Sequence, residues 1–91
     1  MKIQWTGKAL SDLVRLYEFL AAVNPAAAAR AVQALTDAPR RISVHPRLGE
    51  KLEEFEPREV RRLLVGNYEM RYEVREDTVQ IVRLWHTRER R

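Results

Sequence analysis

Two histidines, His45 and His86, are the side chains of this 91-residue sequence whose type ordinarily titrates near neutral pH. They stand in different halves of the chain, and no metal-ligand spacing links them. Cysteine is absent, which excludes disulfides and thiolate metal sites. His86 follows a tryptophan and precedes Thr87-Arg88-Glu89, so it is the candidate acid–base residue. The alternative is a structural histidine that caps a strand end or binds a backbone carbonyl.

Other catalytic constellations are not found in the sequence. Ser11 and Ser43 fall in predicted helices, and no glycine-rich elbow surrounds either of them. The three glycines are scattered, so no phosphate-binding loop is predicted. The carboxylates of residues 50–57 lie in an acidic segment without a histidine, which predicts a solvated connector rather than an acid–base pair. We therefore expect no cofactor and no metal ion.

Arginine is the most abundant side chain that could bind a ligand. The chain carries 17 Lys and Arg against 13 Asp and Glu, a net charge of +4. Arginine forks bind phosphate and carboxylate in a bidentate manner, so arginines on the predicted strands are candidate anion ligands. The alternative is neutralisation by the glutamates that alternate with them, as cross-strand ion pairs. The arginines concerned are Arg61 or Arg62, Arg71, Arg83 and Arg88, and the glutamates are Glu59, Glu69 and Glu73.

Composition and length indicate what kind of domain carries these residues. A chain of 10.7 kDa with 45% hydrophobic and 33% charged residues predicts one small globular domain over residues 1–91. A fold this small leaves much of its surface exposed, which makes a stabilising partner chain plausible. No apolar stretch is long enough to span a membrane, and the N-terminus lacks a signal-peptide core. We expect a cytoplasmic protein.

Two helices are predicted in the first half. Residues 2–5 alternate as a short strand, and Thr6 can cap a helix over residues 7–23. Its apolar residues trace one stripe with helical period, predicted as core, and Lys8, Asp12, Arg15 and Glu18 lie on the opposite, solvated face. Asn24-Pro25 starts a second helix. Pro39 either kinks it or begins a new short turn.

The second half has strand periodicity. Residues 58–65, 68–75 and 78–87 read as strands joined by tight turns at Gly66-Asn67 and Glu76-Asp77. The third of these is apolar on both faces, as a central strand would be. Trp5 and Trp85 are predicted core residues. The fold class is therefore α+β with the order β-α-α-β-β-β, a helical hairpin packed on a mainly antiparallel sheet.

The order and motifs of the whole chain resemble the ParE/RelE superfamily of type II toxin–antitoxin toxins. The fold that this resemblance implies is the one predicted above. The motifs are W-T-x-x-A-x-x-D-L at Trp5–Leu13, N-P-x-A-A at Asn24–Ala28, H-P-R-L-G at His45–Gly49, R-E-V-R-R-L-L-V at Arg58–Val65, N-Y-E-M-R-Y-E-V at Asn67–Val74, and V-x-I-V-R-L-W-H-T-R-E at Val79–Glu89.

The superfamily divides by target, and the resemblance favours one branch. RelE-like toxins cleave mRNA on the ribosome with basic residues and commonly a C-terminal tyrosine or histidine, whereas ParE-like toxins are associated with DNA gyrase. Here Glu69 follows Tyr68 where RelE-like toxins carry an arginine, and no terminal tyrosine follows Arg91. The H-P-x-L-G turn and the ending around His86 look more like ParE and plasmid stabilisation proteins.

The resemblance implies a toxin that inhibits DNA gyrase and blocks replication. Its expected partner is a cognate antitoxin with a ribbon-helix-helix DNA-binding domain, in a hetero-oligomer. We expect the target to be bound by Arg71, Arg83, His86, Arg88, Arg90 and Arg91, and the antitoxin by Leu10, Leu13, Tyr17 and Leu20. The alternatives are a metal-independent mRNA endoribonuclease acting at the ribosome through Arg62, His86 and Arg88, and a purely interacting partner that is harmless alone.

Overall fold

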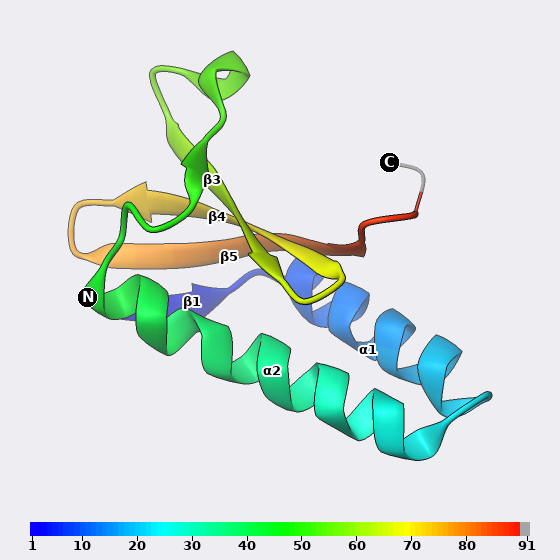
Figure 1. The fold of residues 1–91 in the computed structure, drawn as a ribbon. Helices are drawn as coiled ribbons and strands as arrows, with labels where there is room; N and C mark the ends of the chain where they lie inside the picture. Colours follow the sequence, from blue (N-terminus) through cyan, green and yellow to red (C-terminus); the bar gives the residue numbers. More distant parts are fainter. Residues whose placement is uncertain (90–91) are drawn as a thin grey trace.

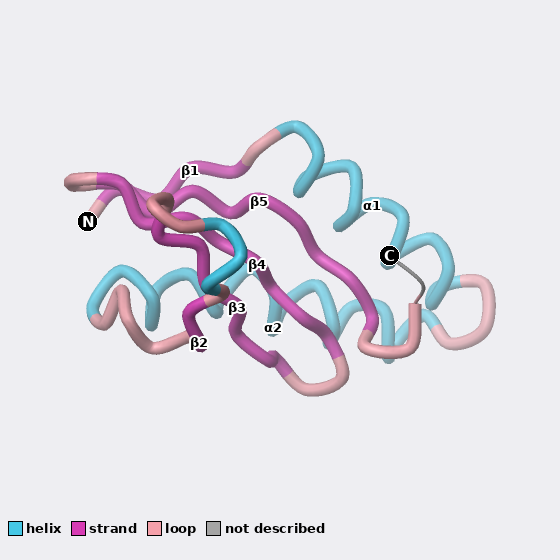
Figure 2. The backbone as a smooth tube through the Cα atoms, turned by 90° about the horizontal axis from the view of Figure 1, so that it is seen from above, coloured by secondary structure: helices cyan, strands magenta, loops and turns pink. Residues whose placement is uncertain are grey.

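Two helices cover one face of a five-stranded sheet (Figures 1 and 2). The computed structural model describes residues 1–89. Its elements are β1 (Lys2–Trp5), α1 (Gly7–Ala21), α2 (Pro25–Val44), β2 (Glu50–Lys51), the 3-10 helix η1 (Glu53–Phe55), β3 (Glu59–Val65), β4 (Tyr68–Arg75) and β5 (Thr78–His86). The predicted α+β class and the helical hairpin are confirmed. β2 and η1 are additions within the segment that we predicted as a solvated connector.

The sheet has the order β1-β5-β4-β3-β2, in which β1 pairs with β5 in parallel and all other neighbours are antiparallel. The tight turn after β3 needs a left-handed backbone at Gly66, whose φ is +60°. β5 lies between β1 and β4, which confirms its prediction as a central strand. However, β1 pairs only as far as Ile81, so the last residues of β5 have a free edge on that side.

The helices begin where the sequence predicts. The Thr6 side chain accepts the Ala9 N–H, and the Asn24 side chain accepts the Ala27 N–H. α1 ends at Ala21 rather than near Val23, because Asn24 must leave helical geometry in order to cap α2. α2 continues through Pro39 to Val44, and Pro39 is buried. Packing of this turn on the sheet compensates for the one backbone hydrogen bond that proline removes.

The core lies between the helical hairpin and the sheet. Leu35 and Ile42 of α2 meet Met70, Tyr72 and Leu84 of the central strands, and all five are fully buried. The two tryptophans, both predicted as core, differ: the second is 7% exposed, whereas the first is only partly buried against the core cluster. No helix in residues 1–89 is long and apolar enough to cross a membrane.

The H-P-x-L-G turn packs against the ring of Tyr72. The hydroxyl of Tyr72 donates to the Pro46 carbonyl at 2.8 Å and accepts the Gly49 N–H at 2.8 Å. A Cβ on Gly49 would lie 2.6 Å from the Arg62 carbonyl oxygen and 2.8 Å from the Tyr72 hydroxyl. Glycine is therefore required here for close approach of the turn to the sheet. Burial raises the pKa of the Tyr72 hydroxyl.

The predicted core stripe of α1 is only partly core. Ala9 and Leu16 are buried, but Leu10 is 50% exposed and Tyr17 is 44% exposed. Asp12, which we predicted on the solvated face, is buried instead. The helical period locates the apolar stripe, but it does not reveal that the neighbouring strand edge requires a carboxylate.

Candidate functional site

The free edge of β5 is closed by side chains of α1. The Leu84 N–H donates to Asp12 Oδ2 at 2.9 Å, and the Leu84 carbonyl accepts from Arg15 at 3.2 Å. Asp12 also binds the Arg83 guanidinium through both oxygens, at 2.8 and 3.2 Å. Burial raises the pKa of the Asp12 carboxyl, but the Arg83 and Leu84 hydrogen bonds and the nearby arginine charges outweigh burial and hold it below its usual value.

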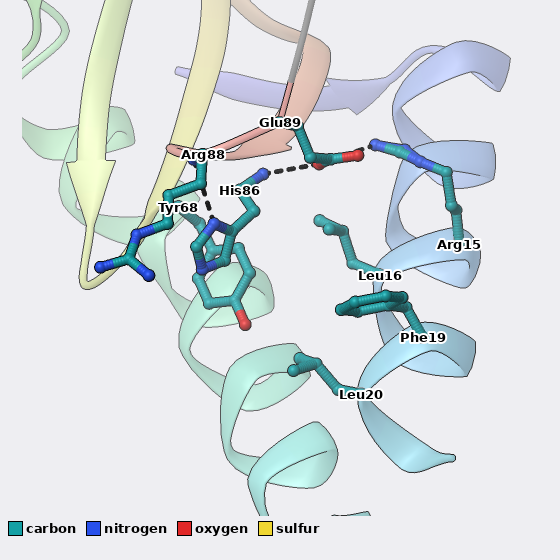
Figure 3. A pocket seen from close by; sticks show the side chains of 8 residues that line it. All are labelled: Arg15, Leu16, Phe19, Leu20, Tyr68, His86, Arg88 and Glu89. Carbon is teal, nitrogen blue, oxygen red and sulfur yellow. Dashed lines mark hydrogen bonds and ion pairs between the residues drawn. The ribbon is translucent and has the colours of Figure 1, made fainter. Parts of the chain in front are cut away.

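The segment after β5 turns back on the same edge (Figure 3). The His86 N–H donates to Glu89 Oε1 at 2.7 Å, and the Glu89 N–H donates to the His86 carbonyl at 2.9 Å. The Arg88 N–H donates to Nδ1 of His86 at 3.1 Å. Glu89 also pairs with Arg15 at 3.4 Å, which attaches the segment to α1. The Nδ1 contact is one that the alternative interpretation predicts, in which His86 caps the strand end.

A hollow of about 490 Å³ lies between α1 and this end of the sheet. The Tyr68 and His86 rings meet edge to face at 5.3 Å on one side of it. Phe19 projects from α1 on the other side and is 73% exposed (Figure 3). Burial raises the pKa of the Tyr68 hydroxyl, which therefore stays protonated and can donate a hydrogen bond. The lining residues are Arg15, Leu16, Phe19, Leu20, Tyr68, His86, Arg88 and Glu89.

The sheet face away from the helices carries a row of arginines. Arg62, Arg71 and Arg83 are register partners across β3, β4 and β5. Each has its own carboxylate: Glu50 at 2.7 Å from Arg62, Glu69 at 3.2 Å from Arg71, and Asp12 at 2.8 Å from Arg83. The like charges that stand side by side are therefore compensated within the chain.

Aromatic rings complete this open face. The Arg71 guanidinium lies 5.5 Å from the Phe55 ring centroid and 4.7 Å from that of Trp85, and Arg83 lies 4.8 Å from Trp85. Glu69 is 1% exposed beneath them. A second carboxylate, Glu73, is held by Arg58 at 2.8 Å and Arg75 at 3.1 Å, and these bonds keep its pKa below the usual value despite burial. Glutamates pair with strand arginines as predicted, and Arg62 meets Glu69 across strands. However, Arg71–Glu69 and Arg75–Glu73 pair along one strand, and the partner of Arg83 is Asp12 instead of a glutamate.

The structure divides the residues that we expected to bind the target. Arg71 and Arg83 lie on the open sheet face, whereas His86 and Arg88 lie beside the hollow. Consecutive residues of a strand point to opposite faces. Arg83 and Trp85 are two residues apart and share the open face, so His86 points to the face that carries the helices. For the same reason Arg62 is not brought to His86 and Arg88, the alternative catalytic set. Arg90 and Arg91 lie outside the described residues.

The four residues expected to bind an antitoxin fall into an exposed pair and a partly buried pair. Leu10 and Tyr17 are exposed, and they share a stripe of α1 with Val14, which is 55% exposed. Leu13 and Leu20 are partly buried, and Leu20 also lines the hollow. Val14 and Phe19 are not among the residues predicted to bind a partner. Their signal in the sequence is that both are apolar residues outside the core stripe.

No group of three or more His, Cys, Asp or Glu side chains in the described part of the chain could hold a metal ion. The arrangement offers two surfaces instead. One is a self-neutralised sheet face, and the other is an apolar hollow bordered by hydrogen-bond donors.

Comparisons with known proteins agree with this fold. A search of the curated proteins found no significant match. Eleven chains of solved structures match. One of them, from the chromosomal ParDE TA system of P. aeruginosa, is 25% identical with a TM-score of 0.78, over 94% of this chain and 95% of that chain. The profile described as ParE toxin of type II toxin-antitoxin system, parDE, matches residues 3–91. This chain therefore belongs to the ParE toxin family of type II toxin–antitoxin systems.

Proposed function

We propose that this ParE-family toxin inhibits DNA gyrase when it is free and is neutralised by a cognate antitoxin. It acts by binding, without chemistry on a substrate. The target contacts the end of β5 and the segment after it, where His86 is partly exposed and Arg88 is exposed. Arg71 and Arg83, which we expected to bind with them, lie on the open sheet face, where each pairs with a carboxylate and lies over the Trp85 ring.

The observation that carries this proposal is the separation of His86 from the arginine row. RNA cleavage without a metal ion needs a base for the 2′-hydroxyl, an acid for the leaving oxygen and cations for the phosphorane, all around one phosphate. The arginine row of the open face consists of Arg62, Arg71 and Arg83, and each of them is paired with a carboxylate. His86 lies on the other face, beside Arg88 and an Arg15 that is paired with Glu89. Its separation from the arginine row favours the binding protein over the endoribonuclease.

The antitoxin is the partner that the family membership implies. We propose that it has a ribbon-helix-helix DNA-binding domain and a second segment that folds along the toxin. Its apolar residues contact the exposed stripe of Leu10, Val14 and Tyr17 on α1, with Leu13 and Leu20 supporting that surface from within. An exposed apolar stripe on a small domain is typical of such an interface.

The direct test uses purified toxin and purified gyrase. Toxin should inhibit supercoiling and leave gyrase trapped on cleaved DNA, and the protein encoded by the neighbouring reading frame should reverse both effects. His86→Ala should raise the inhibitory concentration roughly tenfold or more. The matched control is His45→Ala, because His45 is also exposed but lies at the end of α2.

A second pair of variants tests the charge. Arg88→Ala should weaken inhibition, whereas Arg47→Ala should not, because Arg47 is an exposed arginine paired with Glu59 at the opposite end of the sheet from His86. A toxin that cuts mRNA on ribosomes and leaves gyrase untouched would contradict the proposal. In cells, induction should stop DNA synthesis before translation, and the reverse order would also contradict it.

A further inference from the structure

Arg15 of α1 joins three parts of the chain at the end of β5. Its Nη1 donates to Asp12 Oδ1 at 3.5 Å, and its Nη2 donates to the Leu84 carbonyl at 3.2 Å and to Glu89 Oε1 at 3.4 Å. A planar guanidinium serves several acceptors in fixed directions at once, which the single ammonium of lysine does not. One helix side chain therefore holds both the last residues of the sheet and the segment after them.

Glu89 carries this attachment to the residues that the proposed function assigns to the target (Figure 3). Its Oε1, which meets Arg15, also accepts the His86 N–H at 2.7 Å. The Glu89 N–H donates to the His86 carbonyl at 2.9 Å, and the Arg88 N–H donates to Nδ1 of His86 at 3.1 Å. Residues 86–89 thus form one closed turn, and a single carboxylate oxygen links that turn to α1.

The turn is held from two sides. On the side of the hairpin between β3 and β4, the Thr87 N–H donates to the Asn67 carbonyl at 2.9 Å, and the His86 ring meets the Tyr68 ring at 5.3 Å. On the side of α1, the attachment is the ion pair of Glu89 with Arg15. Loss of the arginine therefore leaves the turn attached to the hairpin but releases it from the helix.

The exposure of the Arg15–Glu89 pair indicates a local role. The two side chains are 40% and 33% exposed, and an ion pair this exposed adds little to the free energy of unfolding of the whole domain. A short segment after the last strand is different, because a few contacts decide how much of the time it keeps one conformation. The same pair can therefore leave the domain almost equally stable and still control how His86 and Arg88 are presented.

We propose that Arg15 is a positioning residue for the inhibition of gyrase: through Glu89 it holds the turn after β5 in the conformation that the target binds. This inference rests on the proposed function, which assigns His86 and Arg88 to the target. Arg15 acts through Glu89 rather than by its own contact with gyrase, because acceptors of this chain already bind its guanidinium. A toxin whose turn keeps that conformation only part of the time has its apparent affinity reduced by the same fraction.

The first experiment measures the inhibition of gyrase supercoiling by variants at both ends of the link. Arg15→Met keeps the length of the side chain and removes its donors, and it should raise the inhibitory concentration about fivefold or more. Glu89→Ala removes the acceptor and should act in the same direction. Lys8→Met is the matched control, because Lys8 is an exposed cation of the same helix and does not line the hollow. It should change the inhibitory concentration less than about twofold, and an effect equal to that of Arg15→Met would reduce the role of Arg15 to its charge and overturn the proposal.

The double variant separates positioning from direct contact. If Arg15 acts through Glu89, Arg15→Met should change the inhibitory concentration less than about twofold once Glu89→Ala is present. If the two effects multiply instead, Arg15 acts on the target independently of Glu89, and the proposal is overturned.

Amide exchange gives a readout that does not depend on gyrase. In the Arg15→Met toxin, the His86 N–H should exchange with solvent roughly fivefold faster, whereas the N–H of the fully buried Met70 should keep its rate. Weaker inhibition with unchanged exchange at His86 would overturn the proposal. So would a fall in Tm with faster exchange at both amides, because Arg15 would then support the whole domain.

The outcomes also separate this inference from the proposed function. If the unaltered toxin leaves gyrase active, the proposed function fails, and the inference fails with it. If the unaltered toxin inhibits gyrase and both single variants inhibit it as strongly, the proposed function stands and only the inference fails.

Discussion

The open sheet face and the hollow beside α1 use the same residue types for opposite purposes. On the open face, Arg71 is stacked between two aromatic rings and paired with the buried Glu69. At the hollow, Phe19 and Arg88 are exposed, and one carboxylate serves both Arg15 and a backbone N–H. Polar groups saturated by their own chain are costly to separate, whereas donors and apolar surface without such saturation are available to a partner.

This difference shows that counting charges does not identify a binding surface. Both regions are rich in arginine, and the open face has the larger number of them. Its arginines nevertheless attract an outside anion weakly, because carboxylates of the same chain already bind their guanidinium groups. The distinction between structural and functional arginines lies in their partners.

The largest expected effect comes from Asp12, because it serves both regions. Asp12→Ala removes the partner of Arg83 on the open face and the acceptor of the Leu84 N–H beside the hollow. We expect a loss of about 3 kcal/mol in the free energy of unfolding and a fall in Tm of about 15 °C. Asp37→Ala, at an exposed site on α2, is the control and should behave as a typical surface substitution. A stable Asp12→Ala protein would show that the two regions do not share this support.

Arg71 tests whether the open face is structural. Arg71→Ala removes two cation–π contacts and leaves Glu69 with less compensation, so it should cost about 2 kcal/mol in chemical denaturation. Arg75→Ala should cost much less, because Arg75 is 60% exposed in its ion pair. If Arg71→Ala instead abolished gyrase inhibition without a change in stability, the open face would be the target surface.

Acid pH should weaken the carboxylate-supported regions in a defined direction. Asp12 and Glu73 have pKa values below their ordinary values of 3.8 and 4.5. Their contribution to stability is therefore complete above those ordinary values and is lost as pH falls through the lower folded-state values. Denaturant unfolding should show a steep loss from pH 5 to pH 3. Asp12→Asn should lose less over that interval, and an unchanged slope would mean that another group controls acid unfolding.

The smallest effect on the free energy of unfolding is expected for substitutions at the hollow. Glu89→Ala removes an ion pair whose two side chains are 40% and 33% exposed, so it should cost less than about 1 kcal/mol overall. The local effect is larger, since the His86 N–H loses its acceptor and should exchange with solvent roughly tenfold faster. Glu18→Ala, on the exposed face of α1, is the control. A global loss as large as that of Arg71→Ala would contradict the contrast between the two regions.

Much of the fold could be predicted from local patterns. Thr6 and Asn24 cap the two helices as expected, and the strand turn at Gly66 follows from its backbone preference. Pro39 inside α2 and the two-residue β2 could not be predicted, because tertiary packing and strand pairing decide them. At the candidate site, His86 and Arg88 were found from the sequence, whereas Phe19 and Glu89 were not.

The sequence alone determined most of the elements, the family and the supply of arginines, because caps, turns and periodicity act over a few neighbouring residues. Only the tertiary structure decided which arginines are neutralised and which side chains face the same surface. Arg71 meets Glu69 beneath two rings, while His86 lies on the other face of the sheet. The physical reason is that strand register and the free edge of β5 bring together residues such as Asp12 and Arg83 that no local pattern links.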